Sequence, residues 1–94
     1  MFNFRSKDPI GQREHDLLKA AQNLVDAVNA MPSGYKSGEL MLAVRDVENA
    51  IENVMIPAIS ARSPRLIRAL TNYPQFLTEE ATTAADELER AMAS

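Results

Sequence analysis

The sequence contains no cysteine and a single histidine in 94 residues. The absence of cysteine excludes a disulfide framework, a thiolate zinc site and a cysteine nucleophile. One histidine excludes any site that needs several histidines, whether that site binds a metal or performs catalysis. No apolar run reaches the ~18–20 residues of a membrane span, and the first residues do not form a secretory signal. We therefore expect a cytoplasmic protein that is not an enzyme, does not bind membranes and holds neither a metal nor another cofactor.

The composition indicates one folded domain with an acidic balance. A chain of this length suits a single domain. Hydrophobic residues make up 46% of the chain and charged residues 24%, which argues against disorder. The formal charge of −3 argues against binding to long nucleic acids, because that binding depends on net positive charge.

Proline and glycine divide the chain into helical segments. Asp8-Pro9 is typical of a helix start, since Asp can cap a helix and Pro suits its first turn. A stretch rich in proline, serine and glycine ends the first segment, and Pro57 ends or kinks the second. Apolar residues recur at steps of three and four, which predicts helices over 9–31 and 37–56. Because their connection is short, these two long helices should form an antiparallel hairpin.

Two shorter helices are expected in the last third of the chain. Ser63-Pro64 repeats the cap-then-proline signature and predicts a helix over 64–71. Acids in a first turn predict a last, alanine-rich helix over 78–92. The predicted fold class is therefore all-α: a hairpin of two long helices, two shorter C-terminal helices and an N-terminal arm at 1–8. Since the shorter helices do not cover two long heptad faces, we expect the chains to assemble as a homo-oligomeric bundle.

Positive charge is concentrated in one window of the sequence. Residues 53–78, a run of 26, contain no acid, and Arg62, Arg65 and Arg68 give this run a charge of +3. The rest of the chain therefore carries −6. Arginines three apart lie on one ridge of a helix. A helix start at Pro64 would also place them near free N–H groups that attract anions. This pattern predicts either a phosphate-binding patch or arginines that pair with the acidic faces of the first two helices.

Two further features lie around the start of the second long helix. Leu42 is opposite the apolar seam, and together with Met41 it indicates a subunit contact, the wall of a ligand pocket or simply tolerated exposure. Tyr35 and Lys36 lie in the loop before this helix. They indicate either a plain turn or a ligand contact at the hairpin tip, where Tyr can stack on a base and Lys can attract a phosphate.

Several features of residues 15–55 carry a resemblance to a known family. These features are a long first helix that ends Val28-Asn29, then Pro32 and Gly34, then the run Leu42-Ala43-x-Arg45-x-Val47-x-x-Ala50. The segment resembles the helical-hairpin domain of small phage proteins that sequester nucleotide immune signals, the anti-CBASS and the related anti-Thoeris sponges. The resemblance implies a homo-oligomer in the cytoplasm of the host cell. It would bind a cyclic nucleotide at subunit junctions without cleaving it, with Arg45 at a motif position.

The favoured hypothesis is therefore non-enzymatic sequestration of a small cyclic nucleotide immune signal. Arginines would hold the phosphates, and the bases would stack at subunit junctions. The alternative is a protein–protein interaction module, such as a small phage inhibitor of a host protein. A small enzyme fits less well because no paired acids are present, and a helix-turn-helix DNA reader is disfavoured by the net charge. The candidate ligand-binding residues are Tyr35, Lys36, Arg45, Arg62, Arg65 and Arg68, and the candidate interface residues are Met41 and Leu42.

Overall fold

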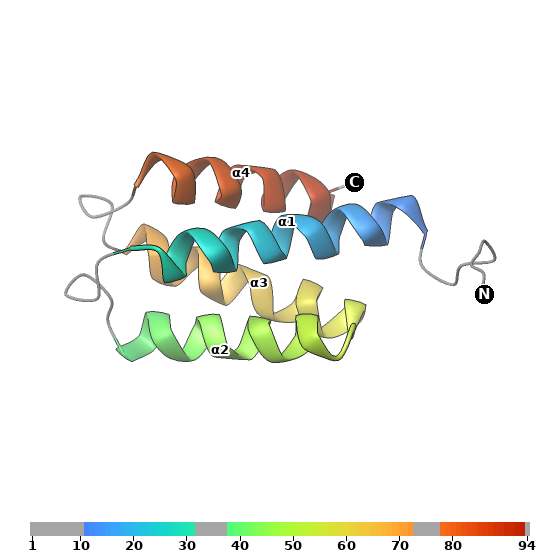
Figure 1. Cartoon of the computed structure of the whole chain (residues 1–94), viewed down its shortest axis with the longest axis horizontal. Helices are drawn as coiled ribbons and strands as arrows, with labels where there is room; N and C mark the ends of the chain where they lie inside the picture. The colour runs from blue at the N-terminus through green and yellow to red at the C-terminus, as the bar shows by residue number, and fades with distance from the viewer. Residues whose placement is uncertain (1–10, 32–37, 73–77, 94) are drawn as a thin grey trace.

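The fold consists of four α-helices. The structure, a computed structural model, describes residues 11–31, 38–72 and 78–93, and these three ranges contain no strand. Figure 1 shows that consecutive helices run in opposite directions. The all-α prediction is therefore confirmed. The helices are α1 (Gln12–Asn29), α2 (Gly38–Glu52), α3 (Ile56–Thr71) and α4 (Glu79–Ala93).

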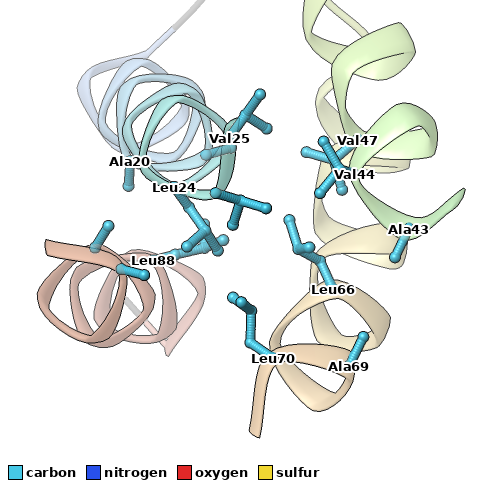
Figure 2. Packing of buried hydrophobic residues seen from close by; sticks show 14 of the residues in the cluster. Ala20, Leu24, Val25, Ala43, Val44, Val47, Leu66, Ala69, Leu70 and Leu88 are labelled. Atoms are coloured by element: carbon cyan, nitrogen blue, oxygen red, sulfur yellow. The ribbon is translucent and has the colours of Figure 1, made fainter. Parts of the chain in front are cut away.

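Each helix contributes one apolar stripe to a common core, because its apolar residues recur at steps of three and four. Figure 2 shows that Leu24 of α1, Val47 of α2, Leu66 of α3 and Leu88 of α4 point into the space between the helices. All four of these side chains are fully buried. Burial of one such side chain stabilises the fold by about 1.5–3 kcal/mol. The core therefore joins all four helices into one unit.

The helices pair most closely as α1 with α4 and α2 with α3. Small buried residues on α4, Ala81 and Ala84, and on α2, Ala43 and Ala50, suit such close packing. α1 contacts α2 and α3 less extensively. The two long helices of the predicted hairpin do run antiparallel, as expected (Figure 1). However, neither is the other's main packing partner, because the C-terminal helices are long enough to pair with each of them.

The start of α3 differs from the prediction. A helix over 64–71 was expected, but α3 begins at Ile56, with Pro57 in its first turn and Pro64 in its interior. Ser63 is fully buried and does not cap a helix. Its hydroxyl instead donates to the carbonyl oxygen of Ile59 across 2.6 Å. A proline in the first turn is favourable because its missing N–H has no intrahelical acceptor there, so Pro57 marks a helix start here.

The end of α2 also differs from the prediction, since the helix stops at Glu52 and does not reach residue 56. Val54 has a φ of 50°, in the left-handed region. Its N–H donates to the carbonyl of Ile51 across 3.0 Å, and the N–H of Met55 donates to the carbonyl of Ala50 across 2.8 Å. These two bonds form a Schellman motif, which closes a helix by turning the chain. The other predicted helices, 9–31 and 78–92, agree with α1 and α4 to within two residues where the structure describes them.

The last two helices are longer than the argument for a homo-oligomeric bundle assumed. That expectation relied on short C-terminal helices that left two heptad faces uncovered. α3 has 16 residues and α4 has 15, and the apolar stripes of α1 and α2 are buried within one chain. Any contact between chains must therefore use a different surface. Within the described ranges, no helix is both long enough and apolar enough to cross a bilayer.

Candidate functional site

Two of the predicted arginines converge on one residue of α2. The Nη1 atom of Arg62 donates to the backbone carbonyl oxygen of Asp46 across 2.9 Å. The Nη1 atom of Arg65 forms an ion pair with the Oδ2 atom of the same aspartate across 3.3 Å. Side chains three apart on α3 reach the same point because they share one ridge of the helix. These contacts place Arg62 and Arg65 at the seam between α2 and α3, which leaves less of their charge for an external anion.

Arg68 lies one turn further along α3 and is exposed. Its side chain forms no hydrogen bond or ion pair with any residue in the described part of the chain. α2 and α3 run antiparallel, so a turn forward from Arg65 on α3 corresponds to a turn backward from Asp46 on α2. This register places Arg68 level with Leu42, an apolar residue with 57% of its surface exposed.

The position of the arginines within α3 differs from the expectation. Because α3 begins at Ile56, Arg62 lies in the middle of the helix and Arg68 lies in its last turn. The last turn carries the negative end of the helix dipole, which favours a cationic side chain but not a bound anion. The predicted attraction of anions by free N–H groups at a helix start is therefore wrong for this ridge. Binding of a phosphate here would depend on the arginine side chains alone.

The remaining predicted site residues do not join this cluster. Arg45 precedes Asp46 in the sequence but points about 100° away around the helix, and it is exposed on α2. Tyr35 and Lys36 lie outside the described residues. Of the six residues predicted to bind a ligand, the structure brings Arg62 and Arg65 together and places Arg68 beside them. Asp46, which no sequence pattern distinguishes from the other acids of the chain, is the residue that connects the first two.

Two adjoining hollows lie along the seam between α1 and α4, with volumes of about 390 and 300 Å³. Alanines form part of their floor, and Asn23 and Glu87 border both. One of the hollows is lined by three acids, Glu79, Glu80 and Glu87, without a basic residue. None of the predicted site residues lines either hollow. The acidic lining makes the first one unsuitable for a phosphate. In the second, two bases, Lys19 and Arg90, are balanced by two acids, Asp16 and Glu87, so neither hollow has a net positive lining.

Apolar side chains are exposed on α2 and on the turn that follows it. Within the described ranges, the exposed large hydrophobic residues all belong to this segment. They are Met41 (42% exposed), Leu42 (57%), Val54 (49%) and Met55 (45%). The sequence indicated the first two, because Leu42 interrupts the polar face of the helix and Met41 is next to it in the first turns. It did not indicate the other two. The apolar steps of three and four run through Leu40, Val44, Val47, Ile51 and Val54, which predicts that Val54 is in the core, and the structure corrects this because α2 ends before it.

Side chains that could hold a metal ion are not gathered in the described ranges. His15 is exposed on α1. No group of three or more histidine, aspartate or glutamate side chains there could hold a metal ion. No protein-family model, curated protein or solved structure matches the chain. Function must therefore be inferred from the surfaces of the molecule itself.

Proposed function

We propose that this protein is a non-catalytic protein-interaction module that acts through the outward side of α2. The observation that carries this proposal is the gathering of all exposed large hydrophobic residues of the described ranges on one segment. We refer to this surface as the α2 face. It consists of Met41, Leu42, Arg45, Asn49 and Glu52 on α2 together with Val54 and Met55 on the turn that follows it, all of which are exposed.

The arrangement of the α2 face suits a protein partner. Single exposed apolar residues are common, but a set of them on one element of a small domain is typical of an interaction surface. Apolar side chains lie at both ends of the face, and polar residues lie between them. Figure 1 shows α2 at the edge of the bundle, so its outward side faces no other helix. Apolar groups can then supply buried area, while charged groups set the orientation of the partner.

Site-specific photocrosslinking in the producing cell tests this proposal. A photoreactive amino acid at Asn49, in the middle of the α2 face, should yield a discrete protein adduct. The same amino acid at Glu89, which is exposed on α4, serves as the matched control and should yield little adduct. Equal yields at the two positions, or no adduct at Asn49, would overturn the proposal.

Binding of a small cyclic nucleotide, as the resemblance implies, is the second candidate function. The observation that favours it is Arg68, which is exposed one turn from Arg65 and level with Leu42 along the pair of helices. A guanidinium can grip a phosphate with two parallel hydrogen bonds, and an apolar side chain nearby can contact a base. This candidate ranks second because Asp46 already engages two of the three arginines. Calorimetry with cyclic dinucleotides and trinucleotides tests it, and an Arg68→Ala variant that binds as well as the unaltered protein would rule out this site.

A further inference from the structure

We infer that the α2 face binds a second copy of this chain, with the two α2 helices packed antiparallel about a two-fold axis. This inference rests on the proposed function and names the partner. A two-fold interface uses the same patch on both subunits, so residue i of one copy contacts residue j of the other, and the reverse contact is also made. The patch must therefore be complementary to itself when its direction is reversed.

The apolar residues of the α2 face satisfy this requirement. Leu42 and Met55 lie at opposite ends of the face and are both about half exposed. When a second α2 is laid antiparallel, with the axis between Glu48 and Asn49, Leu42 of each copy faces the end of the other's α2, where the turn carries Val54 and Met55. Two equivalent apolar contacts then form, one at each end of the interface. A parallel arrangement would instead place each apolar end against an identical end.

The charged residues of the α2 face agree with the same register. The same axis brings Arg45 of each copy next to Glu52 of the other, because both residues lie within α2 at equal distances from the axis along the helix. The side chains of Arg45 and Glu52 are exposed and form no hydrogen bond or ion pair with any described residue of their own chain. Two symmetry-related ion pairs would therefore form between the copies, as they do between flanking positions of paired helices. This charge complementarity argues for a second copy as the partner.

The backbone at Val54 provides an independent observation. A left-handed conformation at this position of a helix end is normally taken by glycine, and for a β-branched residue it is energetically unfavourable. Val54 adopts it with a φ of 50° while half of its side chain is exposed. Burial inside one chain does not explain why valine occupies this left-handed position, since the side chain is half exposed there. Burial against Leu42 or Met41 of a second copy does, because an apolar side chain at the end of the face then becomes covered.

Charge reversal across the proposed axis tests the inference. In a dimer of the Arg45→Glu variant, acids face each other at the paired positions, and in a dimer of the Glu52→Arg variant, bases do. Because like charges repel, each variant alone should self-associate at least about tenfold more weakly than the unaltered protein. In an equimolar mixture, the two attractive pairs are restored in a heterodimer. Native mass spectrometry can distinguish this heterodimer from either homodimer. We expect the heterodimer to dominate in the mixture, and circular dichroism should show that both variants remain helical.

A matched control uses exposed charges on other helices. Arg13→Glu on α1 and Glu89→Arg on α4 should leave the dimer unchanged. The inference is overturned if the unaltered protein is monomeric at every concentration, if both single variants dimerise normally, or if the mixture forms no heterodimer. Crosslinking at Asn49 separates this failure from that of the proposed function. An adduct with a different protein leaves the interaction module intact and removes only the second copy as its partner, whereas no adduct removes both.

Discussion

The Nη1 atom of Arg65 lies 3.3 Å from the Oδ2 atom of Asp46, and this ion pair connects the middle of α3 to the middle of α2. Both side chains are about half exposed, so the pair contributes at most about 1 kcal/mol to stability. Its larger consequence is for function. An arginine that is already paired with a carboxylate is a weaker anion receptor, and this pairing lowers the rank of nucleotide binding among the candidate functions.

Replacing the aspartate should separate stability from anion binding. In Asp46→Ala, Arg65 loses its carboxylate partner, while Arg62 keeps its bond to the backbone carbonyl of residue 46. We expect the free energy of unfolding to fall by less than about 1 kcal/mol. If the second candidate function is correct, binding of a cyclic dinucleotide should become tighter in calorimetry, because Arg65 is released beside Arg68. The matched variant Asp86→Ala, an exposed acid on α4, should alter neither quantity, and weaker nucleotide binding by Asp46→Ala would contradict the site.

Val54→Gly should change stability and self-association in opposite directions. Glycine adopts the left-handed conformation of residue 54 without steric cost, so the variant should be more stable by about 1 kcal/mol. Thermal unfolding should then shift upward by roughly 4–8 °C for a domain of this size. The dimer should become weaker, because an apolar side chain is removed from the α2 face. A variant that is more stable and also associates more strongly would contradict the role given to Val54.

Pro64→Ala should stabilise the monomer fold. Pro64 lies in the interior of α3 and is exposed, where it lacks the N–H that would donate to the carbonyl of Ser60. Alanine restores this donor and has the highest helix propensity, which is partly offset by the greater freedom of its unfolded chain. We expect a gain of about 1–2 kcal/mol in the free energy of unfolding, measured by urea denaturation. A loss of stability would show that a proline-induced bend is needed to seat Leu66 and Leu70 in the core.

The sequence predicted the helical class and most of the helix ends, because apolar spacing and breakers are local signals. It mispredicted the end of α2 and the start of α3, because the same residue type can occur at either end of a helix or inside one. Pro57 can end one helix or begin the next, and Ser63 can cap a helix or bond back to Ile59 within one. Tertiary packing decides between them, since a start at residue 56 allows Ile59 and Ser63 to be buried.

The candidate site was predictable only in part for a similar reason. Three arginines at steps of three show that a ridge exists, but not which acid lies opposite them. Asp46 is 16 residues from Arg62 and 19 from Arg65, so its role depends on how α2 and α3 pair. Leu42 was indicated because helical periodicity alone places it on the polar side of the helix, and Met41 was indicated as its neighbour. Val54 was not, because its exposure follows from a turn that the apolar pattern does not reveal.

Cysteine crosslinking can locate the two-fold axis. The chain has no native cysteine, so a single introduced thiol gives an unambiguous result. Asn49 lies next to the proposed axis, and its two copies should come close enough for the Asn49→Cys variant to form a disulfide-linked dimer under mild oxidation. The Glu89→Cys variant is the control and should form such a dimer much more slowly. Equal rates for the two variants would contradict an axis at the middle of α2.

The central claim, that the α2 face is a protein-contact surface occupied by a second copy, is tested most directly by sedimentation equilibrium over a range of concentrations. The unaltered protein should approach twice the 10.4 kDa mass of one chain as its concentration rises. The Leu42→Glu variant, which places a charge against the apolar turn at Val54 and Met55 of the second copy, should remain at the mass of one chain while keeping its helical content. Dimers of equal strength for both proteins would contradict the assigned surface, and a monomer at all concentrations for the unaltered protein would contradict self-association.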